Sequence, residues 1–399
     1  EPLVVRPTSE TIIGDAFRRW VASYRDLPVL VNQWANVVRW EMRTRMFLRT
    51  SEFLWQEGHT AHADEADARA ETLKMLEVYR ELAEDVLAMP VVVGEKPENE
   101  RFPGADNTYS IEAMMQDGKA LQAGTSHYLG TNFAKAQNIR FQSATGELDF
   151  CHTTSWGVST RLIGGVIMTH GDDDGLRLPP KIAPRQVVVV PMLREKPEDA
   201  EVLAFCEKLK AELDGLSAFG APLRAYLDKK QARAANKRWD WVRRGAPIIL
   251  EVGPRDMAND SVTLIRRDRL REGEKIASVT LTRPELLAQA PALLAEIQAA
   301  LFAQAKARQD RNIRSDFSSV EAIADYFGEE VEDGAGAFKG WIRAPWARPT
   351  GAELEAVEQR LKACKLTLRN IPLGQGPASG NCVFTGRPAV EEILIARAY

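Results

Sequence analysis

The chain has 399 residues, too many for one hydrophobic core, so we expect two or three domains. Hydrophobic residues make up 45% and charged residues 27%, and the net charge of −4 excludes nucleic-acid binding through an overall positive charge. No apolar run approaches the roughly 20 residues of a membrane span, so no membrane partner is expected. The 4 cysteines are widely spaced, which favours a reducing cytoplasm over a disulfide framework.

The first part of the chain, residues 1–182, is predicted to form an α+β domain with a largely antiparallel sheet. It starts without Met, so we expect the natural N-terminus upstream. Short apolar runs at 28–31 and 91–93 are bounded by Pro and Gly and predict strands. Between them, apolar residues at helical spacing predict a helix over 64–88 that Asp64 caps.

The Pro-rich stretch 179–184 marks a boundary, after which strands and helices alternate. We predict strands at 187–190, 223–228, 247–252, 261–266 and 277–281, and helices at 198–214, 233–244 and from Pro284. Residues 183–290 are thus predicted to form an α/β domain. Residues 291–399 are predicted to hold a linker helix and a small α+β C-terminal domain.

The densest motif lies between residues 36 and 63. An apolar strand is expected to carry Arg39 and Glu41 on one face, and a second strand follows with Arg49 and Phe53 four residues apart. Guanidinium groups grip phosphate oxygens, and an aromatic face stacks on a base. The pattern alone fits a solvated hairpin face as well.

Thr8 and Glu10 offer a hydroxyl and a carboxylate that can accept hydrogen bonds from an ammonium group. They equally suit a helix N-terminus, and the two interpretations are compatible. Farther along, Gln122, Thr125 and His127 cluster at a Gly-containing turn. His59 and His62 are spaced like metal ligands, but polar residues before a helix are the better interpretation because no third ligand is specified.

Arg161 is predicted at the start of an apolar helix, downstream of Gly157. A cation there opposes the helix dipole, which favours phosphate binding over helix stability as its reason.

Together these motifs resemble the catalytic core of class II aminoacyl-tRNA synthetases, and closely resemble the prolyl-tRNA synthetases of the archaeal/eukaryote-like type. Arg39, Glu41, Arg49 and Phe53 match class II motif 2, Arg161 matches the motif 3 arginine, and the turn with Thr8 and Glu10 matches the prolyl family's T-x-E loop. The resemblance covers nearly the whole chain, with an anticodon-binding α/β domain in second place. Motif 1 would lie upstream of Glu1.

The resemblance implies ligation of L-proline to tRNA(Pro) through prolyl-adenylate, with ATP and Mg²⁺, by a cytoplasmic homodimer. Arg39 and Arg161 would be catalytic. The implied proline-binding residues are Thr8, Glu10, Arg39, Trp55, Glu57, Phe102, His127, Ser155, Trp156 and Gly157. The implied ATP-binding residues are Arg39, Glu41, Arg49, Thr50, Phe53, Gln122, Thr125, Ser159 and Arg161.

In the second domain, basic residues alternate with Trp239 and Trp241, a composition that suits RNA phosphates and unstacked bases, or equally a basic helix face with buried tryptophans. Arg233 and Lys237 are the tRNA-binding candidates.

The C-terminal region departs from the family pattern. Of the four cysteines that often bind zinc there, only Cys382 is present, and Asn370 and Thr385 occupy two other positions. One thiolate cannot build a tetrahedral structural site, so no metal site and no zinc are expected. No room remains between Phe53 and Ser155 for the large editing domain of other bacterial prolyl enzymes. A synthetase for threonine or histidine, and a non-catalytic paralogue that binds RNA, remain the alternatives.

Overall fold

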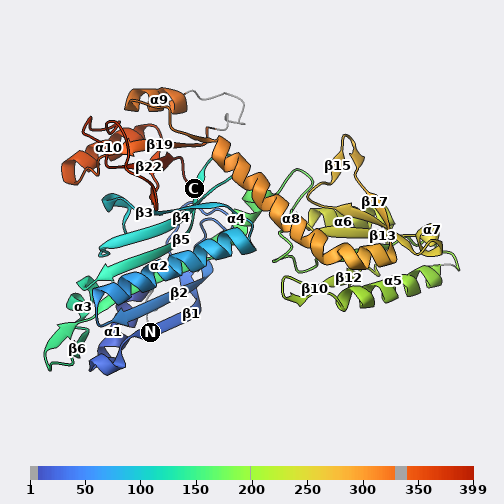
Figure 1. The fold of residues 1–399 in the computed structure, drawn as a ribbon, viewed down its shortest axis with the longest axis horizontal. Coiled ribbons are helices and arrows are strands. Elements are labelled where there is room, and N and C mark those ends of the chain that lie inside the picture. Colours follow the sequence, from blue (N-terminus) through green and yellow to red (C-terminus); the bar gives the residue numbers. More distant parts are fainter. Residues whose placement is uncertain (1–7, 198, 329–338) are drawn as a thin grey trace. The chain divides into compact units, whose positions relative to one another are not determined.

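The computed structural model describes residues 8–197, 199–328 and 339–399, and these form two compact units (Figure 1). Unit 1 comprises the described residues of Glu1–Ala83, Pro90–Gly165 and Arg308–Tyr399, and unit 2 those of Glu84–Met89 and Val166–Ala307. We call Arg308–Tyr399 the C-terminal segment. It belongs to unit 1 with the predicted catalytic domain, and the boundaries at residues 182 and 290 stay predictions. Arg6 and Pro7 of the T-x-E loop lie outside the described residues.

One antiparallel sheet organises unit 1, with the strand order β1-β2-β8-β5-β4-β3-β21. Its strands are β1 (Val29–Val38), β2 (Glu52–His62), β3 (Val91–Glu95), β4 (Asn107–Met114), β5 (Ala120–Gly130), β8 (His152–Ser159) and β21 (Ile371–Pro372). The predicted antiparallel α+β class is confirmed. Shorter elements around it are α1 (Ser9–Trp20), α3 (Asn132–Gln137), β6 (Arg140–Gln142) and β7 (Leu148–Phe150).

Helix α2 (Glu65–Glu81) covers one face of this sheet, as Figure 1 shows. Its N-terminus lies where Asp64 predicts it, because the Asp64 carboxylate accepts a hydrogen bond from the backbone N–H of Asp67 at 2.8 Å. The Tyr79 hydroxyl of α2 donates to Gln56 of β2 at 2.7 Å, which fixes helix to sheet. The predicted helix continues to Val86 only as a π-helical turn, Leu82–Val86. Helix α2 leaves the opposite face of the sheet uncovered, so a binding site can form there.

The first hairpin differs from its prediction. Strand β1 ends at Val38, so Arg39 and Glu41 do not lie on a strand face, although the Arg39 backbone N–H still donates to Ser51 O at 2.8 Å. Met42 and Met46 are 85% and 80% exposed. A strand with alternating side chains is stable when at least one of its faces packs against other residues, and the chain beyond Val38 has no such packed face. It therefore forms a loop rather than a continued strand.

The C-terminal segment has its own sheet, in the order β18-β19-β22-β20, with a core around Trp346. It comprises β18 (Ile313–Arg314), α9 (Val320–Gly328), β19 (Trp341–Trp346), α10 (Gly351–Ala363), β20 (Thr367–Leu368) and β22 (Glu391–Ala396). Strand β21 leaves this sheet and pairs with β3, with Ile371 opposite Glu95. The segment thereby adds an edge strand to the main sheet.

Unit 2 is the predicted α/β structure, with a five-stranded sheet in the order β12-β9-β13-β14-β17. Its elements are α4 (Arg161–His170), which starts in unit 1, β9 (Val187–Pro191), α5 (Asp199–Asp214), β12 (Ala225–Leu227), α6 (Ala234–Arg243), β13 (Ile248–Val252), α7 (Pro254–Ala258), β14 (Ser261–Arg266), β17 (Val279–Thr282) and α8 (Arg283–Arg311), with small ribbons β10 (Ser217–Ala218), β11 (Ala221–Pro222), β15 (Arg271–Glu272) and β16 (Lys275–Ile276). On α5, Val202, Cys206 and Leu209 are fully buried.

Helix α8 is long and apolar enough to span a membrane by length and composition, which the sequence prediction missed. In unit 2 its apolar side packs into the α/β core, where Leu286, Leu294 and Leu301 are buried against Val189 and Leu250. One third of the most apolar stretch of α8 is buried, so burial in this core accounts for part of its apolar composition.

Candidate active site

A cavity of about 290 Å³ opens on the face of the main sheet opposite α2. Its predicted lining residues are Thr8, Glu10, Arg39, Phe53, Trp55, Glu57, Phe102, Gln122, Thr125, His127, Ser155, Trp156, Gly157, Ser159 and Arg161. The lining residues that the sequence motifs missed are Glu100, Arg101, Thr108, Ala123, Gly124 and Val158. Segments far apart in the sequence thus meet at one place.

Strand register explains why they meet. Glu57 on β2 lies opposite Gly157 on β8, and Gly157 lies opposite Thr125 on β5. Thr108 lies opposite His127 on the next pair of strands. Because strand side chains alternate between faces, these positions present their side chains to the same side of the sheet. Thr108 could have been found from this alternation once β4 was assigned.

Gly58 makes room for an aromatic ring on the α2 side of the sheet, behind the cavity. A Cβ atom at Gly58 would lie 1.8 Å from the ring of Trp156 on the neighbouring strand. Only glycine therefore allows the Trp156 indole to lie across β2, on the face where Ser126, opposite Trp156, bonds to Thr72 O of α2. The motifs gave no signal for Gly58, because its role depends on a cross-strand neighbour.

Aromatic and cationic groups share one end of the cavity. The Arg39 guanidinium lies 5.2 Å from the ring centroid of Phe53 and 5.6 Å from that of Trp55. Phe53 and Trp55 themselves meet edge to face at 5.8 Å. Two aromatic rings thus hold an exposed guanidinium beside a flat surface, an arrangement suited to a phosphate next to a stacked base.

Arg161 stands at the first position of α4, as predicted. Its Nε donates to Leu48 O at 3.1 Å and its Nη1 to Gln122 O at 3.3 Å. Burial lowers the pKa of Arg161, and the positive charges of Arg49 and Arg39 lower it further. Mutually repelling cations at the mouth of a cavity are stabilised by a polyanion between them.

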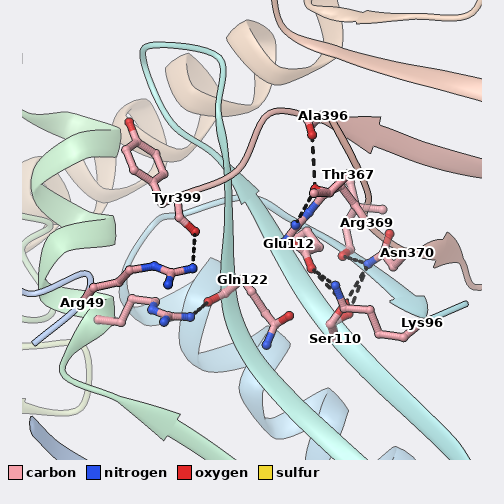
Figure 2. A network of polar contacts seen from close by, with 12 residues as sticks. Arg49, Lys96, Ser110, Glu112, Gln122, Thr367, Arg369, Asn370, Ala396 and Tyr399 are labelled. Carbon is pink, nitrogen blue, oxygen red and sulfur yellow. Dashed lines mark hydrogen bonds and ion pairs between the residues drawn. The ribbon is translucent and has the colours of Figure 1, made fainter. Parts of the chain in front are cut away.

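Arg49, Glu41 and Thr50 are the predicted site residues that do not line the cavity. Arg49 Nη2 donates to the main-chain oxygen of Tyr399 at 3.3 Å, as Figure 2 shows, and Arg49 Nη1 lies 3.7 Å from Glu41. Arg49 is about half exposed, so a ligand can reach its guanidinium. Glu41 holds it from the opposite side of the loop.

The other end of the cavity carries carboxylates. Thr8 occupies the N-cap position of α1, but its hydroxyl donates to the Glu10 carboxylate rather than capping the helix. Ser9 Oγ donates to buried Glu57 at 2.7 Å, and burial, which raises the pKa of Glu57, is outweighed by hydrogen bonds from His59 and Ser9, so that this pKa is lowered. Glu57 is therefore an ionised, fixed carboxylate below the cavity floor.

His127 is held in its neutral form. Burial lowers its pKa to about 4, although the charge of Glu10 opposes this. Its Nδ1 pairs with Thr108 Oγ1 at 3.0 Å, and the Phe102 ring lies 4.9 Å from the imidazole. A neutral imidazole and a phenyl ring together make a wall for an apolar ring.

Two polar atoms in the cavity wall lack hydrogen-bond partners among the described residues. Trp55 Nε1 and Ser155 Oγ are buried and have no hydrogen-bond partner among the residues that the structure describes. Buried polar groups usually find a partner, so atoms left without one beside a cavity indicate contacts made by a ligand.

The two candidates in unit 2 differ. Arg233, just before α6, is exposed and available to RNA. Lys237 is 2% exposed, and its ammonium donates to Asp228 O at 3.0 Å beneath Trp241, whose Nε1 binds the Asp228 carboxylate at 2.8 Å. Lys237 thus stabilises the loop before α6, and its buried ammonium is not placed to contact tRNA as the sequence predicted.

Histidines and cysteines are the residues whose spacing could suggest a metal site. His59 and His62 lie at the end of β2, just before α2, and they pair with Glu57 and Asp67. In the described ranges, no group of three His, Cys, Asp or Glu side chains is placed to hold a metal ion. All four cysteines are free thiols.

Comparison with known proteins gives a consistent result. Residues 1–170 match the model of the tRNA synthetase class II core domain (G, H, P, S and T), and residues 186–288 match that of the anticodon binding domain. The chain is 62% identical over its full length to a proline–tRNA ligase of Sphingomonas elodea, covering 78% of that protein, and 62% identical to that of Sphingopyxis alaskensis, covering 74%. The chain belongs to the proline–tRNA ligase family.

Solved structures of the family have the same fold. Prolyl-tRNA synthetase from Cryptosporidium parvum, complexed with halofuginone and AMPPNP, superposes with a TM-score of 0.90 at 36% identity, covering all of this chain and 78% of that one. Its complex with L-proline and AMP gives 0.89 at the same identity, covering 79% of that chain. The class II fold predicted from the motifs is therefore confirmed.

Proposed function

We infer that the protein ligates L-proline to tRNA(Pro) in two steps. The proline carboxylate attacks the α-phosphorus of ATP, and the bond to pyrophosphate breaks. A ribose hydroxyl at the tRNA end then attacks the carbonyl carbon of prolyl-adenylate, and AMP leaves. The observation that carries this conclusion is one cavity with guanidinium groups at one end and carboxylates with aromatic walls at the other, in a chain 62% identical to proline–tRNA ligases.

We propose that Arg39 and Arg161 are the catalytic residues, acting by charge and orientation rather than as nucleophiles. Arg39 would bind the proline carboxylate and the α-phosphate, and Arg161 the γ-phosphate and one face of the adenine. Phe53 would stack on the other face, and Arg49 would hold the far end of the triphosphate. Negative charge grows on the phosphate oxygens in the transition state, where fixed guanidinium groups stabilise it most. The remaining ATP contacts would come from Glu41, Thr50, Gln122, Thr125 and Ser159.

The proline pocket would use the other end of the cavity. Glu10, with Thr8 beside it, would meet the charged ring nitrogen, and the Glu57 carboxylate lies behind. A saturated five-membered ring suits the walls of Trp55, Phe102 and neutral His127, while Ser155, Trp156 and Gly157 of β8 complete the floor of the pocket. The neutral state of His127 matters, since a second cation beside the ring nitrogen would repel it.

We propose Mg²⁺ as the companion of ATP and no structural zinc. Magnesium in nucleotide sites is held by phosphate oxygens with one or two carboxylates, so it needs no ready-made protein cage. At one of the positions where the family often has a cysteine, Asn370 instead donates its side-chain amide to Val92 O at 3.0 Å. An amide engaged in packing is not a zinc ligand. Metal analysis of purified protein tests this, and one zinc per chain would contradict it.

We propose a homodimer formed through β1, the edge strand of the main sheet. Leu30, Trp34 and Val38 line one face of β1 and are 54%, 82% and 47% exposed, and Trp20 of α1 is exposed as well. An exposed apolar patch of this size marks an interaction site. Light scattering tests the proposed dimer. We expect the wild type to be a dimer and Trp34→Asp to be a monomer. A monomeric wild type would contradict the proposal.

We propose that tRNA is bound partly through unit 2, with Arg233 as a contact, and that the enzyme works in the cytoplasm, where its four free thiols stay reduced. Charging of a tRNA(Pro) transcript with labelled proline tests the function. A tRNA with another anticodon is the control, and failure to acylate tRNA(Pro) under conditions that support prolyl-adenylate formation would contradict the second step.

A further inference from the structure

A buried ion cluster lies beside the active site on the same face of the main sheet (Figure 2). Glu112 of β4 is completely buried, and Lys96 Nζ contacts its Oε1 at 2.8 Å. Arg369 contacts the other oxygen, Oε2, with Nη2 at 2.7 Å and Nε at 3.2 Å. Burial raises the pKa of Glu112, but the charges of Arg369 and Lys96 outweigh it and lower the pKa to about 2. Glu112 is therefore ionised at neutral pH, whereas burial lowers the pKa of Lys96 despite the opposing charge of Glu112.

Arg369 comes from the C-terminal segment, whereas Glu112 and Lys96 belong to the catalytic sheet. Next to it, Asn370 donates to Val92 O of β3 at 3.0 Å and to Ser110 Oγ of β4 at 3.3 Å. Two consecutive residues thus fasten the C-terminal segment onto β3 and β4. Arg369 and Asn370 each pair with buried polar or charged groups of the sheet. The position of the C-terminal segment on β3 and β4 is therefore strongly specified.

A β-bulge connects this cluster to the catalytic arginine. Ile111 lies opposite Gly124 but Glu112 lies opposite Gln122, so Ala123 is the extra residue of β5. A bulge redirects the strand locally and re-aims the groups beside it. Here the Gln122 carbonyl, directly across from Glu112, accepts the hydrogen bond from Arg161 Nη1. The ion cluster therefore lies next to Gln122, whose carbonyl orients Arg161, and stabilises that position of β5.

The charges of the cluster also reach Arg161. After burial and the charges of Arg49 and Arg39, which lower the pKa of Arg161, the Glu112 carboxylate raises it and the Arg369 charge lowers it. Glu112 has the larger effect of the two, so the carboxylate of the cluster supports the charged form of Arg161.

We propose that Arg369 is a positioning residue for prolyl-adenylate formation: through Glu112 and the β4–β5 bulge it fixes the Gln122 carbonyl that orients Arg161. The proposal rests on the proposed function, in which Arg161 binds ATP. It makes the C-terminal segment part of the activation machinery, in place of a role in folding alone.

The test uses Arg369→Met. Methionine fills a volume similar to that of arginine, and the substitution leaves Lys96 and Glu112 as a pair without net charge. We expect kcat for proline-dependent ATP–pyrophosphate exchange to fall by about 10-fold to 100-fold, the KM for ATP to rise, and the KM for proline to stay within about twofold. The matched control is Arg348→Met, which removes another ion pair between the C-terminal segment and the core, to Glu95 at 3.8 Å, away from the bulge. It should exchange like the wild type.

A double-mutant cycle with Arg161→Lys separates positioning from stability. If Arg369 acts through Arg161, the methionine substitution adds little in the Arg161→Lys background. Equal loss in both backgrounds, or exchange within about twofold of wild type in folded Arg369→Met, overturns the inference. Should Arg369→Met not fold, the same criteria apply to Arg369→Lys, which keeps the buried charge but not the guanidinium geometry. A wild type without proline-dependent exchange would instead refute the proposed function.

Discussion

Arg161→Lys tests how the site uses geometry as distinct from charge. Lysine keeps the positive charge, but its ammonium cannot reproduce the planar group whose Nε and Nη1 donate to Leu48 O at 3.1 Å and Gln122 O at 3.3 Å. A hydrogen bond from a charged donor contributes about 1.5–3 kcal/mol. Loss of one such bond, at about 2 kcal/mol, corresponds to about 30-fold in rate, and loss of both to about 1000-fold.

The assay is proline-dependent ATP–pyrophosphate exchange with saturating proline, which isolates the adenylate step from tRNA transfer. We expect kcat to fall between these limits, because the lysine stem fills the space but its ammonium is no longer held by both carbonyls. Arg140→Lys, an exposed arginine over the ring of Phe150, is the control and should be neutral. If Arg161→Lys exchanges within about twofold of wild type, the two carbonyl contacts do not orient a catalytic group.

Three further outcomes follow from the site. Gly58→Ala should raise the KM for proline by about 10-fold or more and spare the KM for ATP, because its methyl group would displace Trp156; Gly376→Ala, where a Cβ meets nothing within 4 Å, is the control. His127 protonates only near pH 4, so the pH profile of kcat/KM for proline between pH 5.5 and 8 should have the same shape in wild type and His127→Asn, and an inflection near 6.5 confined to the wild type would contradict the lowered pKa. Arg233→Glu should raise the KM for tRNA(Pro) by about fivefold and leave exchange intact, whereas Lys237→Met should lower the thermal midpoint, since Lys237 is buried; a wild-type tRNA KM in Arg233→Glu would remove that contact.

Local signals predicted much of the fold. Asp64 set the start of α2, and the apolar runs gave the strands of unit 2, because capping and periodicity depend on neighbours in the chain. The extension of β1 through Glu41 failed, since alternation in sequence does not show whether anything packs on the strand. The sequence also could not show that Ile371 pairs with Glu95, which joins the C-terminal segment to the main sheet.

The predictions for the site residues also succeeded where they depended on neighbours in the chain and failed elsewhere. Residues of contiguous motifs, such as Phe53 and Arg161, were found and do line the cavity. Gly58, Thr108 and the bulge at Ala123 were missed, because each matters through a partner on another strand. Lys237 was misjudged for the opposite reason: a basic residue between tryptophans fits RNA binding and a buried cation equally well, and only its position below Trp241 separates them.

The measurement that tests the central claim most directly is ATP–pyrophosphate exchange by the purified chain with proline, alanine, threonine and histidine in parallel. We predict the highest kcat/KM for proline. Alanine, which lacks two of the ring carbons of proline, should follow at a deficit of at least about 30-fold, because each missing methylene costs about 1–3 kcal/mol in a pocket. Threonine and histidine should give background rates. Exchange supported better by threonine or histidine than by proline, or by none of the four, would contradict the assignment.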